Sequence, residues 1–341
     1  MSFRGNDSLL YQLFFFADGM RSLLAALLLS VVVLAASVSA DQSRKPRIGV
    51  LSAGAPPPPD AVLPFIQQLN ELGWVRGRTV EIHARHANGK LDRLPELADE
   101  LVKLKVDVIV AFGATIRPAA AATHTIPIVM LLGSADPIRD GLVQNLAHPG
   151  TNVTGITWSA GAQLLGRNLQ TLKEVLPGLS RVALLWDGIA GEAFVRAWED
   201  ASQQLGVKVE WHLVREPTEL EPVLSAIAKT RPDVMYVGMG GLTFSSRERV
   251  AALALIHRIP TFAIFRQLPE AGGLLSYGPN LAALHRRGAV YVDRILKGTK
   301  PSELPIEQPT HFELVVNLRT AKSLGLVIPQ SILVSADEVI R

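Results

Sequence analysis

Apolar residues along the chain follow two alternating patterns. Short continuous runs such as 47–51, rich in Val, Ile and Leu, are typical of buried strands. In segments such as 60–72, apolar residues recur every three or four positions, which is typical of a helix with one buried face. The runs predict strands at 47–51, 79–83, 107–112, 126–132, 181–186, 207–213, 233–237, 260–265 and 273–277, and the stripes predict helices at 60–72, 91–105, 116–123, 161–175, 191–205, 218–229, 245–257 and 280–297.

Strands that alternate with helices in this way predict an α/β fold, with parallel sheets covered by helices on both faces. About nine strands fit two doubly wound lobes better than one very wide sheet. No sequence repeat relates the two halves, so the duplication concerns the architecture alone.

The N-terminal segment has the pattern of an export signal. Residues 23–36 are apolar except for Ser30, and this run is shorter than the roughly 20 residues that a membrane-spanning helix needs. A basic residue precedes this run and small residues follow it at 37–40. We therefore expect cleavage after Ala40, with Met20 as the true start and residues 1–19 a spurious extension. An uncleaved membrane anchor is the alternative.

The charge balance argues against nucleic-acid binding. The 34 basic and 31 acidic residues leave a net charge of only +3, and the basic residues do not cluster. The chain has no cysteine, which excludes disulfides, thiolate metal sites, cysteine nucleophiles and a lipid-modified N-terminal cysteine. An exported protein without a lipid anchor implies a periplasm.

Motifs for catalysis and nucleotide binding are absent. The chain has no Walker A loop, no HExxH motif and no GxSxG elbow. Residues 238–241 lack the glycine spacing of a dinucleotide-binding loop. His83 and His86 face opposite sides of a predicted strand, unlike a pair of metal ligands. We therefore expect no catalytic residue, no cofactor and no metal.

Ligands of doubly wound sheets bind at the carboxyl ends of the strands. In this chain those ends are the loops at 52–55, 113–115, 133–137, 186–192, 238–242 and 265–267. The candidate ligand-binding residues, taken from these loops and from the expected hinge, are Ser52, Gly113, Ala114, Thr115, Asp136, Thr157, Trp158, Trp186, Asp187, Gly240, Phe265 and Tyr277.

Two of these loops suggest the chemistry of the ligand. Gly113, Ala114 and Thr115 follow a buried strand and open a helix, where small residues and free N–H groups suit a carboxylate. Simple capping of the helix by Thr115 is the alternative. Asp136 ends the next strand, where it binds an amine or hydroxyl of the ligand or caps the following turn. Trp158, Trp186 and Phe265 are candidates to cover an apolar part of the ligand, or to pack inside the lobes.

Short motifs spread along the chain resemble those of one protein family. They are LGWVRG at 72–77, DRLPELA at 92–98, IPIV at 126–129, PGTNVTG at 149–155, AGGLLSYG at 271–278 and RILKG at 294–298. The tail is the most specific, with LPIEQPTHFELVVNL at 304–318, TAKSLGLVIP at 320–329 and ADEVI at 336–340. In this order, over residues 46–341, they resemble the exported substrate-binding proteins of ABC transporters, of the tryptophan/tyrosine-binding type.

The resemblance implies a type I periplasmic-binding fold, in which two lobes joined by three crossovers hold a ligand between them without catalysis. We expect one lobe from 41–155 and 278–303, a second from 156–277 and 304–341, and a hinge near 153–157, 276–280 and 301–308. Many family members carry an Asn-Pro-rich loop where this chain has WDGIAG at 186–191, and the prolines at 56–59 are also unusual. Both departures touch the expected site, so the resemblance does not identify the ligand.

The preferred function is that of a periplasmic binding protein for a small, amino-acid-like carboxylate. We expect a monomer that delivers this ligand to the permease of an ABC importer in the inner membrane. A ligand-binding component of a membrane sensor is the alternative, and neighbouring permease or kinase genes would separate the two. An enzyme is disfavoured because no nucleophile and base, and no metal ligands, are recognisable. A DNA-binding regulator would need a headpiece where this chain has its apolar signal.

Overall fold

The computed structural model describes residues 44–54, 56, 59–133, 136–158, 162–188, 192–238 and 240–341. Residues 46–341 form one compact unit. The expected signal segment, its cleavage site after Ala40 and the doubtful extension at 1–19 lie outside the described residues.

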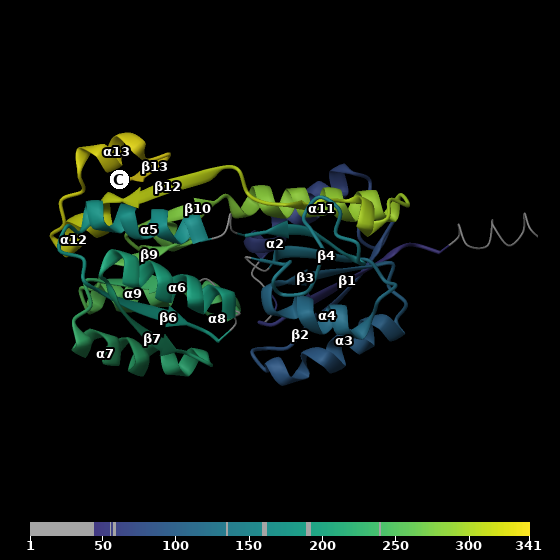
Figure 1. Ribbon diagram of the computed structural model, residues 1–341, viewed down its shortest axis with the longest axis horizontal. Helices are drawn as coiled ribbons and strands as arrows, with labels where there is room; N and C mark the ends of the chain where they lie inside the picture. Colours follow the sequence, from purple (N-terminus) through teal and green to yellow (C-terminus); the bar gives the residue numbers. More distant parts are fainter. Residues whose placement is uncertain are drawn as a thin grey trace, which may run out of the picture. The chain divides into compact units, whose positions relative to one another are not determined.

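The first lobe is built on a six-stranded sheet with the strand order β11-β5-β4-β3-β1-β2 (Figure 1). All neighbouring strands in it run parallel. Helices α2 and α11 cover one face, and α3 and α4 cover the other, which explains why residues 108–111 form an unbroken apolar run. The bounds are β1 (Arg47–Ser52), β2 (Glu81–His86), β3 (Val108–Phe112), β4 (Ile128–Gly133), β5 (Val153–Thr157), β11 (Ile306–Glu307), α2 (Pro59–Glu71), α3 (Leu94–Lys103), α4 (Ile116–Ala122) and α11 (Leu281–Leu296).

The second lobe is built on a seven-stranded sheet with the order β13-β12-β10-β9-β8-β6-β7. Helices α5, α6, α12 and α13 contribute to the core on one face, and α7, α9 and α10 to the core on the other. The bounds are β6 (Arg181–Trp186), β7 (Lys208–Leu213), β8 (Val234–Val237), β9 (Thr261–Ala263), β10 (Leu275–Pro279), β12 (Phe312–Asn317), β13 (Glu338–Ile340), α5 (Ala162–Val175), α6 (Glu192–Leu205), α7 (Leu220–Thr230), α8 (Gly241–Ser245), α9 (Arg247–Ile256), α10 (Gln267–Glu270), α12 (Leu318–Leu324) and α13 (Gln330–Ser335).

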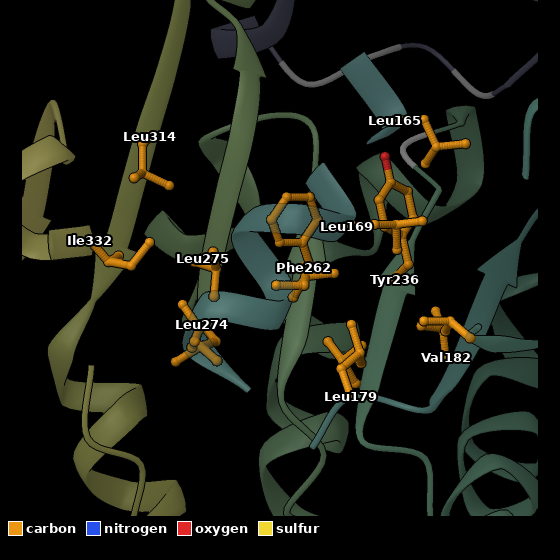
Figure 2. Packing of buried hydrophobic residues seen from close by; sticks show 14 of the residues in the cluster. Leu165, Leu169, Leu179, Val182, Tyr236, Phe262, Leu274, Leu275, Leu314 and Ile332 are labelled. Carbon is orange, nitrogen blue, oxygen red and sulfur yellow. The ribbon is translucent and has the colours of Figure 1, made fainter. Parts of the chain in front are cut away.

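Aromatic side chains fill the centre of the larger core of the second lobe (Figure 2). Tyr236 stacks on Phe262 with 5.5 Å between ring centroids, and fully buried Trp198 meets Tyr236 edge-on at 4.6 Å. Leucines from α5, among them Leu165 and Leu169, belong to the same core and lie near Tyr236. Aromatic packing of this kind fixes the sheet as a rigid platform for the loops at its carboxyl edge.

The predicted fold class, two doubly wound α/β lobes, is confirmed. The predicted strands and helices are present with ends shifted by a few residues, except that two helices begin as 3-10 turns, the one expected at 91–105 at Leu91–Arg93 and the one expected at 218–229 at Pro217–Glu219. Four strands were not predicted, namely β5, β11, β12 and β13. One pair also departs from the expected parallel pattern, because β12 runs antiparallel to β10.

The direction of the strands follows from three passages of the chain between the lobes. The chain leaves the first lobe after β5 and again after β11, and these two strands are parallel. It leaves the second lobe after β10 and re-enters it in β12, which makes that pair antiparallel. The passages lie at or beside the three predicted hinge segments.

The sheets depart from the expected lobe boundaries at three places. Residues 156–157 continue β5, and β11 at 306–307 pairs with β5, so both belong to the first sheet. Residues 278–279 end β10 and pair with β12, so they belong to the second sheet. The rest of the division into lobes stays a proposal.

Candidate ligand-binding site

Thr115 links the carboxyl ends of β1 and β3 from inside the first lobe. It closes a 3-10 turn, Gly113–Thr115, that directly follows β3, in which Gly113 is exposed and Ala114 half-buried. The Thr115 hydroxyl is fully buried and accepts a hydrogen bond from Phe112 N at 2.8 Å. It also lies 3.1 Å from the carbonyl oxygens of Leu51 and Phe112, to which it donates. Backbone groups therefore occupy this hydroxyl, and it makes no capping hydrogen bond to α4.

Asp187 and Gly240, two predicted site residues, lie against each other in the second lobe. The Asp187 carboxylate accepts hydrogen bonds from Leu242 N at 3.0 Å and Thr243 N at 3.5 Å, at the start of α8. Burial raises the pKa of Asp187, and these hydrogen bonds oppose the rise. A Cβ on Gly240 would overlap the carboxylate, so this arrangement requires glycine. Asp187 thus shapes the loop between β8 and α8.

Ser52 and Asp136 also have backbone partners. Asp136 Oδ1 accepts a hydrogen bond from Arg139 N at 3.0 Å, as expected of a residue that caps the turn after β4. Ser52 is the half-buried last residue of β1, and its carbonyl oxygen accepts a hydrogen bond from Ala87 N at 2.9 Å. These contacts fix the loops at the carboxyl edge of the first sheet.

Tyr277 carries an aromatic surface on β10, beside one of the passages between lobes. It is half-buried and stacks on Phe312 with 6.0 Å between ring centroids. The guanidinium carbon of Arg167, an exposed residue of α5, lies 5.9 Å from the centre of the Tyr277 ring. Sequence reasoning missed Arg167, because a lone arginine on a helix carries no signal until the fold places it over an aromatic ring.

The other predicted aromatic residues differ in their exposure. Trp186 is half-buried and meets Trp211 of β7 edge-on at 5.3 Å. Trp158 is half-buried directly after β5, and Thr157 before it is fully buried. Phe265, between β9 and α10, is only 3% exposed.

Polar contacts tie β11 and the residues before it, where the third passage along the chain begins, to the first lobe. Thr154 is fully buried in β5 and its hydroxyl donates to Leu304 O at 2.8 Å. Arg287 of α11 holds Glu307 of β11 through two nitrogen–oxygen contacts, Nε to Oε2 at 2.7 Å and Nη2 to Oε1 at 2.5 Å. The hydrogen bonds from Arg287 lower the pKa of Glu307. Tyr291 completes the attachment by donating to Pro305 O at 2.7 Å.

Glycines permit close packing of β5 and β10, the strands after which the chain first passes out of each lobe. Gly155 in β5 has a φ of 128°, and a Cβ there would overlap the carbonyl oxygen of Met130 in β4. A Cβ on Gly278 in β10 would overlap the carbonyl oxygen of Ile264. These requirements explain the glycines that end the motifs at 149–155 and 271–278.

Loops at the carboxyl edges of the two sheets meet at a pair of glycines. A Cβ on Gly54, in the loop after β1, would lie 3.3 Å from Gly241 Cα, at the start of α8. A Cβ on Gly241 would lie 3.1 Å from Gly54 Cα. Both glycines fall in loops that the sequence indicated, but neither was singled out, because only the fold brings them together.

Neither a metal centre nor a membrane span is found in the part of the chain that the structure describes. Within those residues, no three or more His, Asp or Glu side chains are grouped to hold a metal ion. No helix there combines the length and the apolar character needed to cross a bilayer.

Comparison with known proteins identifies the family. The profile of the family described as ABC transporter substrate binding protein matches residues 60–340, which span both lobes. The chain belongs to this family. The match confirms the resemblance of the sequence motifs.

Curated proteins and solved structures agree with this assignment. A tyrosine-binding protein of Clostridioides difficile (strain R20291) is 24% identical over 290 residues, which cover 84% of this chain and 83% of that protein. A conserved domain protein from Vibrio cholerae has a TM-score of 0.77 at 25% identity, over 87% of this chain and 100% of that one. The similarity extends along nearly the whole of the described chain.

Two further solved structures differ in their ligand state. An ABC domain from Streptococcus pneumoniae in complex with L-Trp has a TM-score of 0.76 at 24% identity, over 87% of this chain and 100% of that one. A ligand-free, open substrate-binding protein with adhesive properties from Clostridium difficile has a TM-score of 0.57 at 25% identity, over 86% of this chain and 99% of that one. The periplasmic-binding-protein fold of this substrate-binding protein is thereby established.

One motif of the sequence has a structural explanation. In LGWVRG, the indole Nε1 of Trp74 donates to Asp293 Oδ1 at 2.8 Å, and Asp293 also pairs with Lys297 at 2.7 Å. Asp293 lies on α11 and is only 7% exposed. Trp74 therefore fastens the end of α2 to α11, far from the carboxyl edges of the sheets.

Proposed function

We propose that the protein captures a small, amino-acid-like carboxylate between its two lobes and delivers it to the permease of an ABC importer. The observation that carries this proposal is the approach of Gly54 to Gly241. It means that the loops at the carboxyl ends of β1 and β8 lie on facing sides of the two lobes. Ligands of doubly wound sheets bind at those ends, so one molecule can touch both lobes.

The first ligands to consider are aromatic amino acids. A relative is named a tyrosine-binding protein, and a structure of the same fold was solved with L-Trp. In this chain, Tyr277 offers an aromatic face and Arg167 a nearby positive charge, which suit a ring and a carboxylate. The backbone N–H groups of Gly113 and Ala114 stay candidates for the carboxylate, whereas the Thr115 hydroxyl is already bonded.

The mechanism that we propose is closure around the ligand. A ligand that touches both lobes binds the closed form more tightly than the open form, and so shifts the population towards it. The three passages supply the hinge, with β11 held firmly to the first lobe by Arg287. No step of this mechanism requires bond making or breaking, so we propose a binding protein without catalytic activity.

The proposed location is the periplasm, reached through the signal at 23–36 and cleavage after Ala40. N-terminal sequencing of the exported protein tests this part directly. A mature chain that begins at Asp41 supports the proposal, and exported protein that retains residues 20–40 contradicts it.

A thermal-shift screen of the mature protein tests the ligand class. L-tryptophan, L-tyrosine, the other amino acids and simple carboxylates are the probes. At a concentration of 100 times Kd, a ligand stabilises the folded state by about 2.7 kcal/mol. With an unfolding entropy of about 2.1 cal/mol/K per residue, that is a rise in Tm of about 4 °C for a chain of about 300 residues. A shift with amino acids supports the proposal, and none with any of these probes contradicts it.

A further inference from the structure

Gly54 and Gly241 meet without any side chain between them, although neither needs to be glycine for its own backbone. Neither residue is among the glycines with positive φ. Each glycine is crowded by the other one, because an added Cβ would come within 3.1–3.3 Å of the opposite Cα and would fit only if the loops moved apart by a few tenths of an ångström. The absence of side chains thus serves the contact and not the local fold.

Each glycine is held in place by its own lobe. In the first lobe, Gly54 O accepts a hydrogen bond from Asn88 N at 3.2 Å, and Ala53 O accepts one from Gly89 N at 2.8 Å. These bonds join the loop after β1 to the loop after β2.

In the second lobe, the loop before Gly241 is fixed by Asp187 and Thr243. Asp187 accepts hydrogen bonds from Leu242 N and Thr243 N, and the Thr243 hydroxyl accepts one from Gly240 N at 2.9 Å. Thr243 also donates to Gly238 O and is fully buried. The network presents Gly241 in a defined position.

The contact lies at the side of the sheets opposite to the hinge. The passages between the lobes involve β5 and β11 at one end of the first sheet and β10 and β12 towards one end of the second. Gly54 follows β1 and Gly241 follows β8, which lie towards the other ends. The lobes approach each other at a second place on the same side of the sheets. A Cβ on Gly89, after β2, would lie 3.7 Å from Arg215 O, after β7.

The comparison structures indicate which state contains this contact. At nearly equal identity, the TM-score is 0.76 with the L-Trp complex but 0.57 with the ligand-free, open protein. The lobes of this chain are therefore arranged more like those of the complex than like those of the open protein.

We propose that Gly54 and Gly241 form a latch, a contact between backbones that lets the lobes close fully on the side opposite to the hinge. The proposal rests on the proposed function and adds to it a role for two residues that do not touch the ligand. Because the latch leaves no space between the loops, the ligand must lie between the latch and the hinge. A side chain at either glycine holds the lobes apart and lets the bound ligand escape.

The first test uses Gly54→Val and Gly241→Val, with Gly178→Val as the matched control. Gly178 lies in an exposed turn of the second lobe, has no atom within 4 Å of an added Cβ and has no positive φ. Stopped-flow and calorimetric titrations with L-tryptophan and L-tyrosine measure affinity and dissociation. We expect each latch variant to lose affinity at least about tenfold, mainly through faster dissociation, because closure and not encounter is impaired. Wild-type affinity in both latch variants would overturn the proposal.

The second test needs no ligand and exploits the absence of cysteine from the chain. Gly54→Cys and Gly241→Cys are combined and oxidised, beside the control pair Gly54→Cys with Gly178→Cys. Two cysteine side chains hold the loops slightly apart but still within reach of a disulfide, which requires Cα atoms about 4.4–6.8 Å apart, so only the latch pair is expected to crosslink. If the valine variants do not fold, this pair decides the matter.

The outcomes separate the latch from the proposed function. Crosslinking of the latch pair, with no amino acid bound by the wild type, would retain the latch and reject the amino-acid ligand. Binding by the wild type, with no crosslinking of the latch pair in the presence of L-tryptophan or L-tyrosine, would reject the latch and retain the proposed function.

Discussion

Replacing Thr115 by valine and by serine separates a structural role of its hydroxyl from a role in ligand binding. Valine keeps the shape and removes the hydroxyl, which leaves Phe112 N and Leu51 O without that partner. A buried donor left unpaired costs about 1–3 kcal/mol. The added methyl returns about 0.8 kcal/mol, so we expect Thr115→Val to lower the free energy of unfolding by about 0.2–2 kcal/mol.

Serine provides the opposite change at the same position. Thr115→Ser keeps the hydroxyl and loses one buried methyl group, which costs about 0.5–1.5 kcal/mol, as other buried methyl deletions do. With an unfolding entropy of about 2.1 cal/mol/K per residue, the valine variant should melt up to about 3 °C below the wild type. Calorimetric unfolding measures this shift, and titration with an amino acid that the wild type binds measures affinity.

The pattern of the two measurements decides the role of Thr115. We expect both variants to be less stable and to bind the ligand with wild-type affinity. A valine variant that melts with the wild type but binds at least about tenfold more weakly would refute our reasoning. The hydroxyl would then have to leave the backbone and bond the ligand.

Three further substitutions test other parts of the account. Gly155→Ala should destabilise the protein by more than about 3 kcal/mol, because the new Cβ meets the Met130 carbonyl oxygen in a backbone conformation that favours glycine. Urea unfolding measures this loss. A loss below about 1 kcal/mol would contradict the close packing of Gly155 on β4. Glu307→Gln should make the free energy of unfolding fall less steeply at acid pH. Arg287 lowers the folded-state pKa of Glu307, so the stabilisation by this carboxylate is present at neutral pH and is lost as the pH falls through that pKa. A fall as steep as that of the wild type would contradict this role of Glu307. Asp187→Asn should change the dependence at higher pH instead. Burial raises the folded-state pKa of Asp187, so the stability that the wild-type acid contributes falls as the pH rises from its ordinary pKa to the raised one, and the variant should lose this fall. Stability profiles between pH 3 and 8 measure both, and a difference between Asp187→Asn and the wild type that does not change with pH would argue against the raised pKa.

The elements that the sequence predicted are those whose pattern is set by local burial. Residues 108–112 are covered on both faces and read as a continuous apolar run, and α3 buries Leu94, Leu97 and Leu101 along one side. The missed strand β5, with the sequence VTGIT, is fully buried but mixes threonines and a glycine among its apolar residues. Gly155 leaves room for the Met130 carbonyl oxygen, and the Thr154 hydroxyl donates to Leu304 O, so both depend on partners elsewhere in the sequence.

The candidate site was predicted less completely, because its residues act through partners remote in sequence. Thr115 was placed correctly at the end of β3, but its hydroxyl bonds Leu51 O, 64 residues earlier. Asp187 and Gly240 were both chosen, yet their mutual contact becomes visible only in the fold. Which of the predicted residues touch a ligand stays a prediction.

The measurement that tests the central claim most directly is a calorimetric titration of the mature protein with L-tryptophan and with L-tyrosine, combined with X-ray scattering before and after saturation. The account predicts saturable binding of at least one of them at one molecule per chain. The radius of gyration should fall on binding, because the lobes close around the ligand. Heats no larger than those of dilution for both amino acids, with scattering curves unchanged at millimolar concentration, would contradict the claim that this chain closes on an aromatic amino acid.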